Sequence, residues 1–123
     1  MKRGMELIRK ILLSAEASEY QGGEPYERYW AQTVDEAYQI FLMVDADLVE
    51  ADTERTNTIP TGASIIRLTW AGHDFLDASR DNKIWKLAME KVIRPGASFT
   101  FSLLVDWLKQ EAQRRLLGTP TMP

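Results

Sequence analysis

The sequence predicts a small α+β fold that is mostly helical. Apolar residues recur at helical spacing in five segments, and residues 64–69 are rich in branched side chains and alternate in part, as a strand does. The resulting order is helix, short strand, helix, strand, loop, strand and then further helices. A helix that leads into a two-stranded hairpin, with another helix before it, is the winged-helix form of the helix-turn-helix fold. We therefore expect a winged-helix core with a small antiparallel β-wing and additional C-terminal helices.

The chain is long enough for one domain with its own core. Its 123 residues combine 45% hydrophobic with 27% charged side chains, an ordinary globular mixture. Residues 1–118 are expected to form a single winged-helix-like domain, followed by a flexible tail over 119–123.

The first helix is predicted over residues 2–17. Ile8, Ile11, Leu12 and Ala15 fall on one face of it. A Gly-Gly-Glu-Pro break follows, and the aromatic segment 26–30 is typical of a short strand. This strand takes the place of the separate helix that normally precedes a recognition helix, which is one departure from the usual helix-turn-helix.

The second helix has a clear start signal at Thr33. Thr33 and Glu36 form a capping box, in which the hydroxyl accepts the N–H three residues on and the carboxylate reaches back. Behind the box, an apolar stripe is expected to face the core, and the chain then turns into a strand over residues 48–51. The stripe consists of Ala37, Ile40, Phe41, Val44 and Leu48.

The hairpin and the third helix follow. Residues 52–63 are polar and contain Asn57, Pro60 and Gly62, which predicts a loop or hairpin tip before the return strand over residues 64–69. Thr69 is the expected N-cap of a helix whose inner face holds Gly72, Phe75, Leu76 and Ser79. Because glycine costs about 1 kcal/mol against alanine inside a helix, Gly72 is expected to pack closely against another helix.

Two more helices are predicted beyond residue 80. Asp81 or Asn82 caps the fourth, which carries Trp85, Ala88, Met89 and Val92 on one face and ends at the Arg-Pro-Gly of residues 94–96. Ser98 or Thr100 caps the fifth, whose inward positions are Phe101, Leu104, Val105 and Leu108.

Four segments resemble domain-of-unknown-function family 2513. They are MKRGMELIRKILL, YQIFLMVDADLVEA, RLTWAGHDFLDASRDNKIW and SFTFSLLVDWLK, which together span nearly the whole chain. Members of that family are common in phages, prophages and bacterial genomes, so the resemblance implies a protein of that kind. It implies no catalytic or binding residues, because the family has no established activity.

No constellation of residues predicts catalysis, a cofactor or a metal. The chain has no cysteine and a single histidine, His73, which stands four residues before Asp77 and lacks a second histidine to complete a metal site. Nucleotide-binding glycine motifs and the nucleophile-elbow motif are absent. The paired carboxylates fit a solvated helix face better than a hydrolase site. We expect a non-enzymatic, cytoplasmic protein without a membrane segment.

The four tryptophans are assigned to the core. Trp85 and Trp107 match helical core spacing, Trp30 fits a strand, and Trp70 at the strand-to-helix junction is expected to cap the core. Aromatic surface left over on the fourth and fifth helices would suit a homodimer interface.

The fold favours a DNA-binding transcription regulator, although the charge pattern weighs against it. The net charge is −3, and residues 31–80 hold nine acids against three bases. Between Thr33 and Glu50 the expected recognition helix and the turn after it carry five acids and no base, which a phosphate-lined groove would repel. The DNA contacts then expected are Lys2, Arg3, Arg9, Lys10, Arg55 and Arg67.

The alternative is a protein-interaction module, such as a phage inhibitor of a host protein or defence system. Its acidic face on the second helix would comprise Asp35, Glu36, Gln39, Met43 and Asp47. The sequence leaves DNA and a host protein both open as partners.

Overall fold

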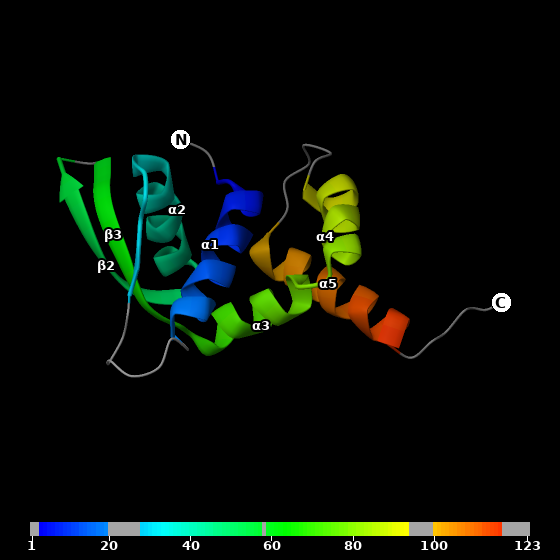
Figure 1. Cartoon of the computed structure of the whole chain (residues 1–123). Helices are drawn as coiled ribbons and strands as arrows, with labels where there is room; N and C mark the ends of the chain where they lie inside the picture. Colours follow the sequence, from blue (N-terminus) through cyan, green and yellow to red (C-terminus); the bar gives the residue numbers. More distant parts are fainter. Residues whose placement is uncertain (1–2, 20–27, 58, 94–99, 117–123) are drawn as a thin grey trace. The chain divides into compact units, whose positions relative to one another are not determined.

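The computed structural model describes residues 3–19, 28–57, 59–93 and 100–116, and within these ranges the fold is α+β and mostly helical, as predicted (Figure 1). The elements in chain order are α1 (Met5–Glu19), β1 (Tyr29–Trp30), α2 (Val34–Asp45), β2 (Val49–Thr56), β3 (Ile59–Leu68), α3 (Trp70–Ser79), α4 (Asn82–Ala88), the π-helical turn η1 (Met89–Ile93) and α5 (Phe101–Leu116). The expected tail over 119–123, Lys2 and the expected strand residues 26 and 27 lie outside the described ranges.

The chain divides into two compact units, Met1–Leu76 and Asp77–Pro123, with the boundary inside α3. The single domain expected over residues 1–118 stays a prediction. Each unit is described by itself below.

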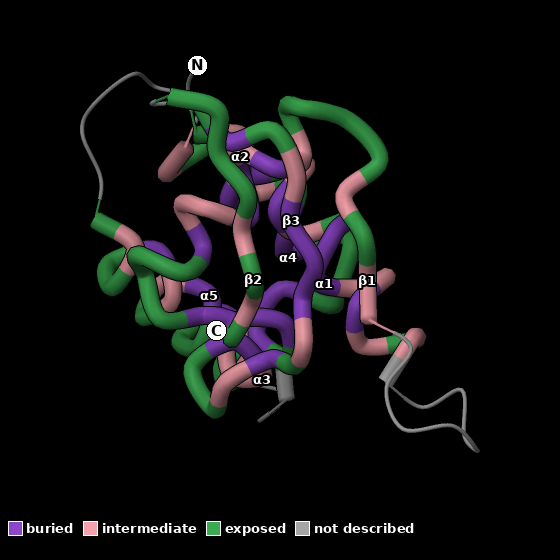
Figure 2. Tube along the Cα trace, turned by 90° about the vertical axis from the view of Figure 1, so that its left-hand side faces the viewer, coloured by how far each residue is buried: buried purple, intermediate pink, exposed green. Residues whose placement is uncertain are grey.

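The first unit is built on a three-stranded antiparallel sheet in the order β1-β3-β2. β3 lies in the middle and is the most buried of the strands, as the purple stretch in Figure 2 shows. Helices α1 and α2 both pack against β3 and against each other. The core consists of Met5, Ile8, Ile11, Leu12, Ala15, Ala37, Ile40, Met43, Leu48, Val49, Ala63, Ile65, Leu68, Phe75 and Leu76. The stripe predicted for the first helix is thus buried throughout.

The hairpin is longer than the sequence indicated. Residues 52–56 and 59–63, expected as a loop, extend β2 and β3, and the two strands pair as far as Thr56 and Ile59. The prediction was wrong because one face of β2 is solvated, so its outward positions are polar although the backbone is paired. Pro60 fits in the central strand because it lies at a register shift close to the tip, where a missing N–H is tolerated.

The second unit packs α4 against α5. Both predicted caps are confirmed: the Asp81 carboxylate accepts the N–H groups of Lys83 and Ile84 at 2.8 and 3.1 Å, and the Thr100 hydroxyl accepts that of Leu103 at 3.0 Å. The core of the unit is formed by Ala78, Ile84, Trp85, Ala88, Leu104 and Leu108. The predicted fourth helix changes to π-helical geometry after Ala88, and its expected end at 94–96 lies outside the described residues.

Candidate interaction surface

Helix α2 is anchored at its start by the side chain of Glu36. Thr33 Oγ1 accepts the Glu36 N–H at 3.0 Å, as the capping box predicts. The Glu36 carboxylate, however, accepts the N–H of Gln32 at 3.0 Å and the hydroxyl of Tyr29 at 2.7 Å, so it reaches one residue further back than expected. Burial, and then the hydrogen bond and negative charge of Glu36, raise the pKa of Tyr29 to about 12. Glu36 is half-buried, and its hydrogen bond with Tyr29 connects β1 to α2.

Gln39 and Met43 do not belong to an exposed face, which corrects the sequence-based assignment. Each is only 1% exposed. The buried side of α2 holds Ala37, Ile40 and Met43, whereas Phe41 is half-buried and Val44 exposed. The core-facing stripe is thus rotated relative to the predicted one.

The buried amide of Gln39 has defined partners. Its Oε1 accepts the N–H of Gly4 at 2.8 Å, and its Nε2 donates to Asp35 Oδ1 at 3.3 Å. Because a buried amide is tolerated when its polar atoms are bonded, Gln39 can occupy a core position and connect the start of α1 to α2.

The remaining acids of the predicted face are exposed, and a second set of exposed acids lies on the solvated face of β2. Asp35 lies in the first turn of α2 and Asp47 in the turn after it, while Asp45 ends the helix. On β2, alternate residues are acidic and exposed, and alternation places them on one side of the strand. We call Asp35, Asp45, Asp47, Glu50, Asp52 and Glu54 the acidic α2–β2 surface.

The bases expected on the wing are already in contact with other side chains. Arg67 Nε forms an ion pair with Glu50 at 2.8 Å, and the guanidinium of Arg55 lies 4.4 Å from the centre of the Phe41 ring. Arg28, which sequence reasoning missed, forms an ion pair with Asp52 at 2.6 Å and also donates to Ser64 Oγ at 3.2 Å. Its role depends on the pairing of Asp52 with Ser64 in the sheet, which no local sequence signal reveals.

Of the bases expected on the first helix, Arg9 and Lys10 lie on α1, and Arg3 precedes it. Arg3 and Lys10 are exposed, Arg9 is half-buried, and Lys2 is outside the described residues. Their use as DNA contacts stays a prediction.

Two tryptophans assigned to the core are exposed. Trp30 is 61% and Trp70 is 84% exposed, whereas Trp85 is buried and Trp107 half-buried. Trp30 lies on β1, at one edge of the sheet. For Trp70 the sequence did hold a signal, because it stands two residues before Gly72 and therefore about 200° around α3 from the buried face.

The turn between α2 and β2 is fastened to the start of α3. Thr69 N–H donates to the carbonyl oxygen of Leu48 at 3.0 Å, and Thr69 Oγ1 donates to that of Asp47 at 2.5 Å. The same hydroxyl accepts the Gly72 N–H at 3.1 Å, which confirms Thr69 as an N-cap. The expected close packing of Gly72 is confirmed, but its neighbour is the Leu48 backbone and not another helix, which corrects the prediction. Asp47 has a φ of 61°, a left-handed conformation that this turn requires.

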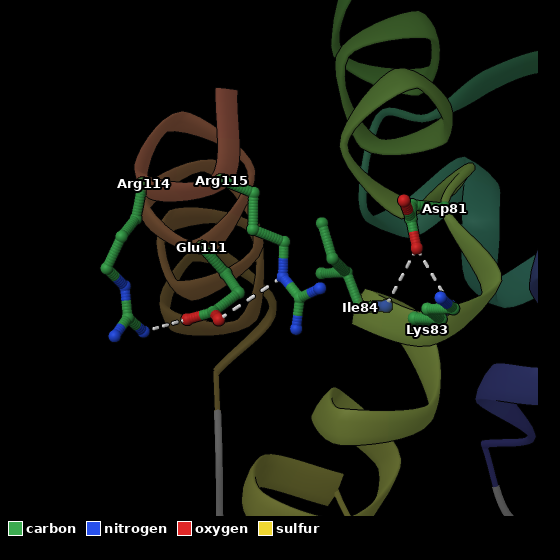
Figure 3. A network of polar contacts seen from close by, with 6 residues as sticks. All are labelled: Asp81, Lys83, Ile84, Glu111, Arg114 and Arg115. Atoms are coloured by element: carbon green, nitrogen blue, oxygen red, sulfur yellow. Dashed lines mark hydrogen bonds and ion pairs between the residues drawn. The ribbon is translucent and has the colours of Figure 1, made fainter. Parts of the chain in front are cut away.

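The second unit holds a polar network around two carboxylates (Figure 3). Glu111 is buried and forms ion pairs with Arg114 and, at 3.6 Å, with Arg115. Hydrogen bonds from the backbone N–H groups of Ile84 and Lys83, with the positive charge of Arg115, hold the pKa of Asp81 below its ordinary value. The hydrogen bonds lie at the start of α4 and the ion pairs lie within α5. Asp81 and Glu111 therefore both have structural partners within their own helices.

His73 is half-buried on α3. Among the described residues, no group of three or more His, Asp or Glu side chains could hold a metal ion. In the same part of the chain, the helices are too short or too polar to cross a membrane.

Two comparisons relate this chain to known proteins. The family model described as "Hypothetical protein (DUF2513)" matches residues 2–98. The chain belongs to this family. A relative from Haemophilus influenzae, described as an uncharacterized protein, is 35% identical over 118 residues, which are 92% of this chain and 93% of that protein. No solved structure matches.

The resemblance noted in the sequence is thus confirmed. In this DUF2513 protein, the matched residues include the whole acidic α2–β2 surface and Trp70, whereas α5 lies beyond them. Neither description names a ligand or an activity.

Proposed function

We propose that this DUF2513 protein is a non-enzymatic protein-interaction module whose acidic α2–β2 surface binds a basic surface of a partner protein. One observation carries the proposal. The helix that precedes the hairpin, where a winged-helix protein places its recognition helix, presents exposed carboxylates and no base. In the phage or prophage setting that the sequence suggested, the partner is a host protein.

The contacts of the wing support a protein partner over DNA. A DNA-binding wing keeps its bases available for phosphates, but Arg67 is neutralised by Glu50, Arg28 by Asp52, and Arg55 lies over Phe41. DNA would therefore meet exposed carboxylates such as Asp45 and Glu54 at short range, and the use of Arg28 or Arg67 would require the release of their ion pairs.

DNA binding is the second candidate because of the fold. The sheet order β1-β3-β2, with α2 leading into the hairpin, is compatible with the predicted winged helix, although α2 is the single helix between β1 and β2. In this alternative DNA would lie across the bases of α1 instead.

A charge-reversal experiment separates the two candidates. Asp35→Lys combined with Asp45→Lys reverses two exposed carboxylates of the acidic surface and leaves the structural Glu36 in place. Because Asp35 also accepts a hydrogen bond from Gln39, folding of this variant is checked by circular dichroism. The control combines Glu90→Lys with Asp106→Lys, two exposed acids in the second unit, and changes the net charge by the same amount.

The tagged wild type and both variants are used to capture proteins from a bacterial lysate, and the captured protein is purified and titrated. We expect a partner that binds the wild type and the control but not the Asp35/Asp45 variant. In parallel, labelled duplex DNA is titrated at low and at physiological salt. DNA binding that persists at physiological salt, with partner capture unaffected by the reversal, would show that the acidic surface is not the binding site.

The predicted homodimer through the fourth and fifth helices is a separate proposal. Exposed Leu103 on α5 is apolar surface that such an interface would cover. Light scattering on the full chain measures the mass directly, and a monomer at high protein concentration would exclude the homodimer.

A further inference from the structure

Trp70 is the most exposed of the large hydrophobic residues in the described ranges. It is 84% exposed, and it is the first residue of α3. Single exposed apolar residues are common on protein surfaces, but tryptophan usually buries most of its large ring. An indole left almost entirely in water is therefore a site where binding would gain much apolar contact.

The backbone at Trp70 is held in place. The preceding residue, Thr69, donates both its N–H and its hydroxyl to the turn after α2, and two residues later Gly72 packs against the carbonyl oxygen of Leu48. An aromatic side chain on a fixed backbone loses little conformational entropy when a partner covers it, as at the energetic centre of many interfaces.

The charges at this junction are negative. Asp45 ends α2, Asp47 lies in the turn whose carbonyl oxygen accepts the Thr69 hydroxyl, and Asp74 follows one turn after Trp70. The base nearest in sequence, Arg67, is paired with Glu50. His73 is the other titratable group on this turn of α3.

An exposed indole at a junction that carries aspartates matches the chemistry of arginine. The guanidinium stacks on an indole face through a cation–π interaction and can donate two parallel hydrogen bonds to a carboxylate. A second copy of this chain is a poorer occupant, because a two-fold contact centred on Trp70 would bring the two sets of aspartates together.

We infer that Trp70, with Asp45 and Asp47, forms a docking point for an arginine side chain of the partner protein. This inference rests on the proposed function and adds to it the residue that anchors the partner. Trp30, the other exposed tryptophan, lies on the edge strand β1, two residues after Arg28, and is excluded from the docking point.

The test uses fluorescein-labelled oligo-arginine and oligo-lysine peptides of equal length, titrated by fluorescence anisotropy at low salt. We expect Trp70→Ala to weaken oligo-arginine binding about tenfold and oligo-lysine binding less. Trp70→Phe retains a ring and should lose less than the alanine variant. Trp30→Ala is the matched control and should bind as the wild type does, with folding of each variant checked by circular dichroism.

Three outcomes would overturn the inference. Trp70→Ala could bind as the wild type, both tryptophan variants could lose affinity equally, or the wild type could fail to bind oligo-arginine. The first outcome, together with loss of binding in the Asp35/Asp45 variant, would leave the proposed function standing without an anchor at Trp70. In the other two, the proposed function is decided by the partner capture described above.

Discussion

A Cβ atom added to Gly72 would lie 2.0 Å from the carbonyl oxygen of Leu48. This oxygen already accepts the N–H of Thr69 at 3.0 Å, so the start of α3 and the start of the wing are in direct backbone contact. Neither side of the contact is a flexible side chain that could move aside. The close approach explains why a glycine is found inside a helix, where alanine would otherwise be preferred.

We therefore predict that Gly72→Ala destabilises the protein. Relief of the clash requires a shift of backbone in α3 or in the turn after α2, and overpacking of this kind costs about 2–3 kcal/mol. The free energy of unfolding by urea measures the effect.

Gly62→Ala provides the comparison for Gly72→Ala. There the added Cβ would approach Glu54 Oε1 at 2.8 Å, which is the end of a flexible and exposed side chain. We expect a much smaller loss of stability for it. Equal effects at the two positions would contradict the explanation by backbone contact.

The side chain of Thr69, at the end of β3, connects the turn after α2 to the start of α3. We expect its removal to destabilise the protein more than the loss of an ordinary helix cap does. The hydroxyl donates to Asp47 and accepts from Gly72, so Thr69→Val, which keeps the shape and removes the oxygen, leaves two backbone groups without that partner. We expect about 1–2 kcal/mol of destabilisation by thermal or chemical unfolding.

Thr69→Ser restores the hydroxyl and is the control for Thr69→Val. It should retain most of the stability of the wild type. A serine variant as unstable as the valine variant would assign the effect to packing of the methyl group rather than to the hydrogen bonds.

Local signals in the sequence located the helices, and long-range contacts decided what the sequence missed. The caps at Thr33, Thr69, Asp81 and Thr100 depend on residues at most three positions away, and all are confirmed. The rotation of α2 depends on Gln39, whose partner Gly4 is 35 residues earlier in the chain. An amide at a core position looks like a surface residue until such a partner is known.

The same distinction applies to the candidate surface. The negative charge of α2 was evident from composition, but the neutralisation of the wing bases depends on sheet register, which places Glu50 opposite Arg67. The exposure of Trp70 could be predicted from the sequence, because helical periodicity alone places this residue opposite the buried face of α3.

The negative charge of Asp45 should destabilise helix α2, at whose C-terminal end it lies. It is the last residue of α2, where the negative end of the helix dipole disfavours a carboxylate, and the last turn contains no base. We predict that Asp45→Lys raises the free energy of unfolding by about 0.5 kcal/mol, while weakening partner binding if the acidic α2–β2 surface is the site. Stability is measured by urea unfolding at low salt.

The effect of Asp45→Lys should shrink as salt is added, because exposed charges are screened. Asp106→Lys, within α5 rather than at its end, is the comparison and should change stability less. A variant at Asp45 that is destabilised would contradict the dipole argument.

The stability of the first unit should fall at high pH because of Tyr29. Its pKa is raised to about 12 in the folded protein, from an ordinary value of 10. A raised pKa means that the folded state holds the proton more tightly than the unfolded chain does. The resulting stabilisation is complete below pH 10 and is lost as the pH rises from 10 to 12. Because Tyr29 is partly exposed, we expect a loss of about 1 kcal/mol, less than the full shift would give.

Tyr29→Phe isolates this titration from that of the other tyrosines. The variant lacks the hydroxyl that donates to Glu36 at 2.7 Å, so it should be less stable than the wild type at pH 8. The difference between the two proteins should narrow toward pH 12, since the wild type loses the same interaction when Tyr29 ionises beside the Glu36 carboxylate. Unfolding by urea at pH 8, 10 and 11.5 gives the three differences, and a difference that stays constant over this range would show that Tyr29 titrates at its ordinary pKa.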